Sequence, residues 1–449
     1  MNETRTEGSC TTPFFSAVYW LGLYLLLVLA PLFVLLIGPV PPGSGFWWDL
    51  SMALGFSGMA IMGVLFFLTA RFRRATAPFG IDIIYYFHRY LALMAFGLIF
   101  LHFLIIRIDN VEALGAINPL QASWYMTSGR VALLLFALII ITSLWRKPLR
   151  IHYDQWRMLH IGLAVTTFLL ALGHIEGVGY YIEAPAKRWL WTGYTLFWLL
   201  LIAYVRLIKP WQMSNRPYRV AELRQEHGNS WTLALEPDGH QGMRFKPGQF
   251  AWLTLRASPW HIKEHPFSLS SSADRHDRLE FTIKELGDFT RTIKQSQVGE
   301  IAYLDGPYGV FSVDRYPDAP GFVFIAGGVG AAPIVSMLRT LADRHEQRPM
   351  WLIYGNNRWQ DVIFREELEA LKQRLDLRLL HVLKEPPSDW KGESGLITPE
   401  LLQKVLPGDA QKLEYFLCGP RPMSDASQQG LHALKVPLCQ IHFELFDMV

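Results

Sequence analysis

Long apolar runs occupy the first half of the chain, and short alternating runs occupy the second half. Six of the long runs have the composition of membrane-spanning helices, because about 20 consecutive apolar residues are needed to cross the hydrocarbon core of a bilayer. They lie at about 15–38, 46–69, 82–107, 129–145, 156–176 and 187–208. The pattern therefore predicts a six-helix transmembrane bundle.

From about Tyr218 the apolar positions alternate within short runs that are bounded by glycine and proline, which is typical of antiparallel strands. These runs are WTLALEP, FAWLTLRA, LEFTIKEL and EIAYLDGP. After Gly321 apolar strands such as FVFIAGG, MWLIYGNN and LRLLHVLKE alternate with helical segments, a pattern that predicts a parallel α/β sheet. We therefore expect a multi-domain chain, with a transmembrane domain over 1–211, an antiparallel β-barrel domain over 212–318 and an α/β domain over 319–449.

Basic residues gather in the loops that follow the second and fourth apolar runs, and again after the sixth run. The opposite loops hold fewer basic residues, with Arg107, Lys187 and Arg188 as exceptions. Basic loops stay on the cytoplasmic side of a membrane. We therefore expect a multi-pass protein of the cell membrane, inner or plasma, whose N-terminus and C-terminal half are both cytoplasmic.

Composition excludes several other classes of protein. The net charge of +3 is too small to indicate a nucleic-acid partner. The three cysteines, Cys10, Cys418 and Cys439, are scattered along the chain, so they lack the spacing of a zinc site, an iron–sulfur site or a disulfide framework.

Two of the apolar runs each contain a pair of histidines at the same spacing. His88 and His102 lie fourteen positions apart, as do His160 and His174. Fourteen residues rise about 21 Å along an α-helix and return to nearly the same face. Because histidine is costly in hydrocarbon, these positions indicate function. We predict one b-type haem between His88 and His160 at the cytoplasmic end and another between His102 and His174 at the outer end. A proton relay or another metal is the alternative.

Three segments of the second half suit a nucleotide cofactor. HPFSLSSS at 265–272 offers hydroxyls and an aromatic ring, although a serine run is often a solvated loop. IKELGDFT at 283–290 contains a Gly–Asp turn whose backbone N–H groups could face a pyrophosphate. FIAGGVGAAP at 324–333 joins an apolar strand to a helix, and its glycines would let the backbone approach a pyrophosphate. A tight structural turn is the alternative for this last segment.

Seven motifs in this order resemble one family: HPFSLSS, IKELGDFT, DGPYG, GGVGAAP, YGNN, FLCGP and a C-terminal FELF. The second half resembles the ferredoxin–NADP reductase superfamily. With the paired histidines, and the YDQWRMLH segment that leads to His160, the chain is similar to the membrane branch of that superfamily, the ferric reductases and NADPH oxidases. The resemblance begins at the second or third apolar run and reaches the C-terminus.

The resemblance implies a role for each motif. The residues that it places at FAD are His265, Pro266, Phe267, Ser268, Gly287 and Thr290. The residues that it places at the nicotinamide coenzyme are Gly327, Gly328, Gly330, Pro333, Cys418, Gly419 and Pro420. Ser268 would lie close to the reactive flavin ring and Cys418 beside the nicotinamide. Phe446 would cover the flavin until the nicotinamide displaces it, and an ordinary core residue is the alternative.

Arg358 follows the second strand of the α/β domain, where a cation can pair with the 2′-phosphate of a coenzyme. This position favours NADPH, with NADH as the alternative if Arg358 is only a solvated surface residue.

The expected function is transmembrane electron transfer from cytosolic NADPH through FAD and two haems to an acceptor outside the cytoplasm. Oxygen, giving superoxide, is the first acceptor considered. A ferric chelate and a partner protein of the envelope are the alternatives. In animal NADPH oxidases a further histidine lies one turn beyond the outer ligand, and here that position is Ile106. This difference weakens the interpretation that oxygen is the acceptor.

Overall fold

The computed structural model describes residues 8–36, 45–72 and 81–444. Two compact units make up the chain, one holding residues 11–210 and the other residues 1–10 and 211–449. Each unit is described by itself.

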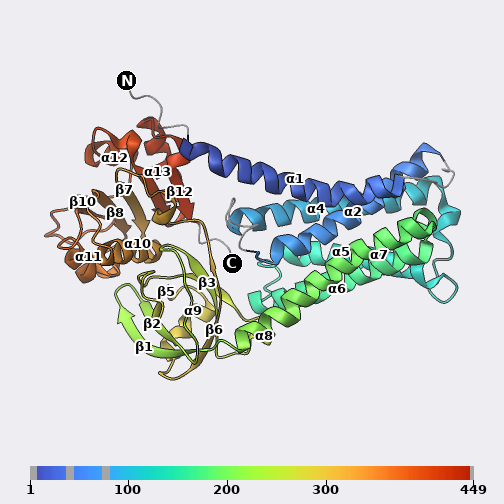
Figure 1. Ribbon diagram of the computed structural model, residues 1–449, viewed down its shortest axis with the longest axis horizontal. Coiled ribbons are helices and arrows are strands. Elements are labelled where there is room, and N and C mark those ends of the chain that lie inside the picture. The colour runs from blue at the N-terminus through green and yellow to red at the C-terminus, as the bar shows by residue number, and fades with distance from the viewer. Residues whose placement is uncertain (1–7, 37–44, 73–80, 445–449) are drawn as a thin grey trace. The chain divides into compact units, whose positions relative to one another are not determined.

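Long apolar helices form the first unit. They are α1 (Gly8–Leu36), α2 (Phe46–Thr69), α4 (Ile81–Asp109), α5 (Trp124–Leu144), α6 (Tyr153–Val178) and α7 (Pro185–Ala203), which continues through a π-helical turn into α8 (Lys209–Ser214). Helix α2 packs along α4, and α5 packs along α6 (Figure 1). Large buried side chains such as Phe168 and Trp198 fill the centre, whereas side chains such as Leu134 are exposed outward, as expected of a surface that faces lipid.

Five helices are long and apolar enough to cross a membrane within the described ranges, namely α2, α4, α5, α6 and α7 with its continuation. These five coincide with expected spans. Helix α1 covers most of the remaining expected span, 15–38, but the apolar part described within it, Val18–Ala30, is shorter. The sixth membrane span therefore stays a prediction.

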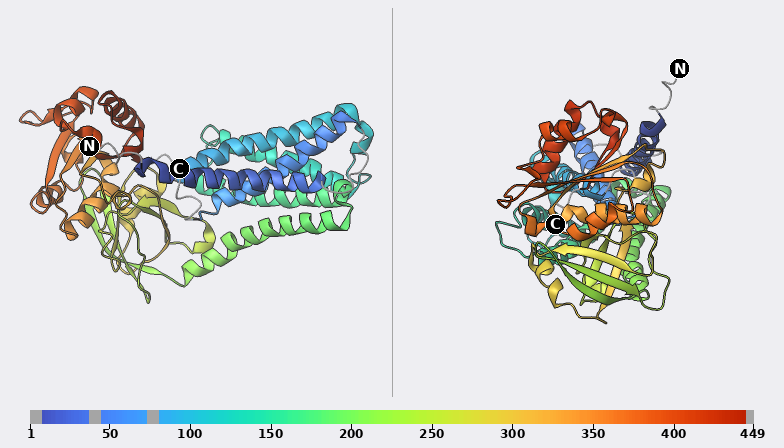
Figure 2. Two further views of the ribbon diagram at one scale, coloured as in Figure 1. Left: turned by 45° about the horizontal axis from the view of Figure 1, so that its top comes forward. Right: turned by 90° about the vertical axis from the view of Figure 1, so that its left-hand side faces the viewer.

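The second unit begins with an antiparallel sheet. Its strands are β1 (Tyr218–Glu226), β2 (Ser230–Pro237), β3 (Phe250–Leu255), β4 (His265–Ser268), β5 (Leu279–Lys284) and β6 (Ile301–Tyr308), in the order β4-β3-β6-β1-β2-β5. The strands curve around a buried apolar core (Figure 2). Within the described residues, an isolated β-bridge between Leu269, just after β4, and Phe281 of β5 links the two edges of the sheet. The sheet is thus a half-barrel, and the closed barrel expected from the sequence is not confirmed.

A parallel sheet follows, with strands in the order β10-β9-β8-β7-β11-β12. The strands are β7 (Phe322–Gly327), β8 (Met350–Asn356), β9 (Leu377–Leu383), β10 (Glu393–Ser394), β11 (Glu414–Cys418) and β12 (Ile441–Glu444). The helices are α10 (Ala331–Asp343), α11 (Arg365–Leu371), α12 (Pro399–Val405) and α13 (Arg421–Ala433). Apolar clusters cover both faces of the sheet, which explains why its central strands are continuous apolar runs. The predicted strand–helix alternation is confirmed here.

Candidate functional site

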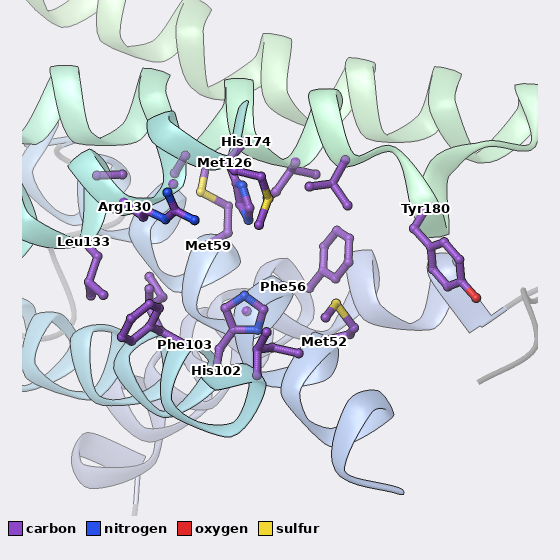
Figure 3. Close-up of a pocket in the computed structure, with 18 of the residues that line it drawn as sticks. Met52, Phe56, Met59, His102, Phe103, Met126, Arg130, Leu133, His174 and Tyr180 are labelled. Carbon is purple, nitrogen blue, oxygen red and sulfur yellow. The ribbon is translucent and has the colours of Figure 1, made fainter. Parts of the chain in front are cut away.

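His102 on α4 and His174 on α6 line the same cavity in the helical unit, and both rings point into it (Figure 3). We call this space the outer cavity, after the end of the helices that the sequence predicts to face outward. The other lining side chains are mostly apolar, among them Met52, Phe56, Met59, Phe103, Met126 and Leu133. The cavity has a volume of about 190 Å³. A single buried water needs roughly 10–15 Å³ on the same measure. The cavity therefore suits a large apolar group between two imidazoles.

Backbone carbonyls fix the orientation of both imidazoles. The Nδ1 atom of His102 lies 2.8 Å from the carbonyl oxygen of Ser51, and Nδ1 of His174 lies 3.0 Å from that of Tyr125. A carbonyl can only accept, so each Nδ1 carries the hydrogen and donates. The Nε2 atom of each ring is then the unprotonated nitrogen, which is the form that binds a metal. The residues present thus fit the axial ligation of a haem iron.

Two glycines make room for these rings. A Cβ added to Gly55 would lie 3.2 Å from Nδ1 of His102, and one added to Gly129 would lie 2.8 Å from Nδ1 of His174. Sequence reasoning missed both glycines, because a glycine in an apolar helix gives no sign of the side chain that it faces.

His88 on α4 and His160 on α6 form the second pair, with ring centroids 6.3 Å apart. Metal–nitrogen bonds of about 2.0–2.1 Å on both sides of an ion place two coaxial imidazole centroids roughly 6 Å apart, so the separation fits a shared iron. The Ser143 hydroxyl oxygen lies 3.3 Å from Nδ1 of His160. The structure thus brings the four histidines together in the two expected pairs. Among the described residues there is no cluster of three or more metal-ligating side chains, but a haem iron needs only two.

The segment expected at FAD lies along β4. The rings of His265 and Phe289 stack with centroids 3.9 Å apart, and Phe267 lies 5.9 Å from the same phenyl ring. Ser268 is buried. Phe289, which sequence reasoning did not single out, therefore joins the expected residues into one aromatic surface.

Thr290 organises the turn that was expected near the FAD pyrophosphate. Its hydroxyl oxygen accepts hydrogen bonds from the backbone N–H groups of Leu286 and Gly287, each at 2.8 Å. Gly287 directly precedes the short helix α9 (Asp288–Arg291). The structure therefore brings Gly287 and Thr290 together. The backbone N–H groups of Leu286 and Gly287 are already hydrogen-bonded to Thr290 and are not free for a pyrophosphate.

The glycine-rich loop after β7 packs against the loop after β11. A Cβ on Gly330 would lie 2.2 Å from the carbonyl oxygen of Cys418, and one on Gly327 would lie 2.7 Å from Cδ of Pro420. The loop is also anchored by the Tyr354 hydroxyl, which donates to the carbonyl of Gly328 at 3.0 Å. Close approach of these loops at the carboxyl edge of a parallel sheet is the expected setting for a dinucleotide.

Two further residues expected at the coenzyme, Gly419 and Pro333, lie close to the carboxyl edge of the parallel sheet. Gly419 packs on the backbone of Gly327, and Pro333 is buried in the first turn of α10. Phe446 lies outside the described residues, so its role stays a prediction.

Cys418 is a free, fully buried cysteine, and burial raises the pKa of its thiol well above the ordinary value. The thiol therefore stays protonated at neutral pH, which suits a packing role rather than a nucleophilic one.

Arg358 has an acidic partner that the sequence did not indicate. Its Nε donates to Oε2 of Glu385 at 2.8 Å, and both side chains are more than half exposed. The pair joins the carboxyl ends of the neighbouring strands β8 and β9.

Three family models match successive parts of the chain. Residues 54–172 match the ferric reductase like transmembrane component, residues 228–312 match an FAD-binding domain, and residues 324–429 match the oxidoreductase NAD-binding domain.

Curated relatives match the second half. The reductase component of propane 2-monooxygenase from Mycolicibacterium smegmatis is 34% identical over 224 residues, covering 48% of this chain and 63% of the relative. NADH-cytochrome b5 reductase 1 from Laccaria bicolor is 32% identical over 189 residues, covering 40% and 60%. The chain thus spans about three fifths of the length of these relatives.

Two solved structures are similar to this chain. The ferredoxin reductase in carbazole 1,9a-dioxygenase is 25% identical, with a TM-score of 0.46, over 51% of this chain and 69% of that chain. The flavohemoglobin from Malassezia yamatoensis is 17% identical, with a TM-score of 0.49, over 89% and 97%.

The three matches account for the helical unit, the half-barrel and the parallel sheet in turn. With five apolar helices and the ferric reductase match, the chain is a multi-pass membrane protein. The FAD and NAD matches give it the two domains of a pyridine-nucleotide-dependent flavin oxidoreductase. The chain therefore has the architecture of the ferric reductases and NADPH oxidases, a ferric reductase-like transmembrane part followed by FAD-binding and NAD-binding domains.

Proposed function

We propose that this protein is a dihaem flavocytochrome that carries electrons from NADPH, through FAD, across the membrane to an acceptor outside the cytoplasm. One haem b is held by His88 and His160 and a second by His102 and His174. One observation carries the proposal: His102 and His174 face each other across an apolar cavity with both Nδ1 atoms tied to backbone carbonyls.

The groups that the chain would hold supply the redox chemistry, since haem takes up and releases single electrons. The chain's own residues position these groups. Carbonyls of Ser51 and Tyr125 hold the imidazoles in the ligating tautomer, which also raises their basicity as ligands. The apolar lining excludes water and so tunes the potential. In the second unit, the stacked His265 and Phe289 rings would border the flavin, and the glycine loop after β7 would hold the coenzyme pyrophosphate.

Oxygen, reduced to superoxide, is the acceptor that we propose first, and a ferric chelate is the second candidate. One observation favours the ferric chelate. Ile106, one helical turn beyond His102, lines the outer cavity and offers no polar group to a small oxygen species there. A relay to a partner protein is a third candidate, because relatives of the second half are named as reductase components of oxygenases.

The test is the haem content and acceptor choice of the purified protein. We expect two low-spin haems per chain in a pyridine haemochromogen assay, and one haem per chain would contradict the four-ligand assignment. With NADPH, superoxide formation and reduction of a ferric chelate are then compared on the same sample. Dominant superoxide formation supports the first acceptor, and dominant chelate reduction supports the second.

A further inference from the structure

Arg130 on α5 points into the outer cavity beside His174 (Figure 3). Among the described residues that line this cavity, it is the one with a permanent charge, because guanidinium stays protonated in proteins. It lies in the second turn of a membrane-spanning helix that begins at Trp124. A cation at this depth is costly unless an anion compensates it.

The described partners of Arg130 do not supply that anion. Its Nη1 donates to the carbonyl of Ala116 at 2.7 Å, and its Nη2 donates to the carbonyl of Leu114. Both acceptors are neutral backbone groups of the loop between α4 and α5. In the described part of the chain no carboxylate forms an ion pair with Arg130. Guanidinium has five N–H donors, so three remain for another ligand.

We propose that Arg130 binds a carboxylate group within the outer cavity. The planar fork of guanidinium matches a carboxylate with two parallel hydrogen bonds. Two sources share this chemistry, the carboxylates on the rim of the haem between His102 and His174, and a carboxylate-bearing ferric chelate that takes electrons there. The inference rests on the proposed function for its ligand, although the binding site itself is built from Arg130 and the cavity.

The first arm of the test measures the redox potential of the outer haem in the full-length protein. If the carboxylate belongs to haem, Arg130→Gln lowers this potential, because it removes a positive charge that favours the reduced state. Arg130→Lys keeps the charge and should retain most of the effect of the native residue. Arg107→Gln is the matched control, since Arg107 is an exposed arginine in the last turn of α4.

The second arm measures binding of gallium citrate, a redox-inactive stand-in for ferric citrate, by titration calorimetry. If the carboxylate belongs to the acceptor, Arg130→Gln weakens binding roughly tenfold to a hundredfold, the usual value of a charge-assisted hydrogen bond, whereas a carboxylate of haem leaves citrate binding unchanged. The control should bind as the wild-type protein does.

The two arms separate the inference from the proposed function. A wild-type protein without haem would contradict the dihaem proposal, yet the calorimetric comparison would still test Arg130. Unchanged potential together with unchanged citrate binding in Arg130→Gln would overturn the carboxylate site. If Arg130→Gln does not insert into the membrane, the same two measurements are made on Arg130→Lys. This variant keeps the charge but loses the planar guanidinium, so unchanged values would again overturn the carboxylate site.

Discussion

At the scale of single residues, Gly129 controls the space in which His174 sits. An alanine Cβ at this position would lie 2.8 Å from the ring, and the ring cannot move without losing its bond to Tyr125. Overpacking of this kind costs about 1–3 kcal/mol. We expect Gly129→Ala to displace the imidazole and to lower occupancy of the outer haem, seen as a smaller haem content and an altered low-spin spectrum.

Gly162→Ala is the control for this prediction. Gly162 lies on the same helix as His174, and a Cβ there would meet no atom within 4 Å. Alanine is a better helix former than glycine by about 1 kcal/mol, so this variant should keep both haems and its stability. Equal haem contents in the two variants would show that Gly129 is not a constraint on the ring.

The Arg358–Glu385 pair controls access to the expected 2′-phosphate site. An exposed ion pair stabilises a protein by only about 0–1 kcal/mol, so a phosphate could displace Glu385 from Arg358. The Glu385 carboxylate would still repel the phosphate. Glu385→Gln should therefore lower the KM for NADPH and leave the KM for NADH nearly unchanged. Arg358→Ala should raise the KM for NADPH roughly tenfold to a hundredfold.

Steady-state kinetics with both coenzymes check this prediction. Lys372→Ala, which removes a similar surface pair with Glu369, is the control. Equal effects of Arg358→Ala on NADPH and NADH would show that the arginine has no phosphate to bind.

At the scale of secondary structure elements, a largely buried network of ion pairs joins β5 to α10 and α11. Arg339 donates from Nη1 to Glu280 at 2.8 Å and from Nε to Glu367 at 2.6 Å. Removal of one partner from a buried pair costs about 3–5 kcal/mol. We expect Arg339→Met to reduce the unfolding free energy by that amount, measured by release of FAD from the full-length protein. Arg374→Met, at an exposed pair with Asp343, should cost under about 1 kcal/mol.

The same network predicts a dependence of stability on pH. Burial raises the pKa of Glu280, but Arg339, Arg224 and Arg278 outweigh burial, so the pKa lies below the ordinary value. The carboxylate then stabilises the folded state above about pH 4.3, and that contribution is lost as the pH falls through the lowered pKa. Glu280→Gln should flatten the acid limb of the stability profile, and an unchanged acid limb would contradict the role of this carboxylate.

The sequence predicted elements better than it predicted contacts. Apolar runs and alternation located strands β2, β3 and β5 to β9 and five of the spans, because burial alone imposes those periods. Whether the half-barrel closes could not be predicted from the sequence, because closure depends on how β4 and β5 approach each other at Leu269. The partner of Arg358 could not be predicted either. Glu385 lies 27 positions away in the sequence, and the two side chains come together only because β8 and β9 are neighbours in the sheet.

At the scale of the whole molecule, the proposed order of electron transfer can be tested by removing one haem at a time. In His102→Ala, NADPH should still reduce the flavin and the inner haem, and reduction of the outside acceptor should stop. In His88→Ala the flavin should be reduced while the outer haem stays oxidised. Stopped-flow absorbance separates these species, with His152→Ala, an exposed residue outside both pairs, as the control. Reduction of the outer haem in His88→Ala would contradict the order.

The fourteen-residue spacing of the histidines has an electrical consequence. It separates the two pairs by about 21 Å along helices that cross roughly 30 Å of hydrocarbon. Under the proposed relay, each electron that passes from one pair to the other carries negative charge across about two thirds of the insulating layer. Moving one charge across the full layer is worth about 2.3 kcal/mol per 100 mV, so this step is worth about 1.6 kcal/mol per 100 mV. Turnover would therefore discharge an inside-negative membrane, and the voltage would in turn help to pull electrons outward.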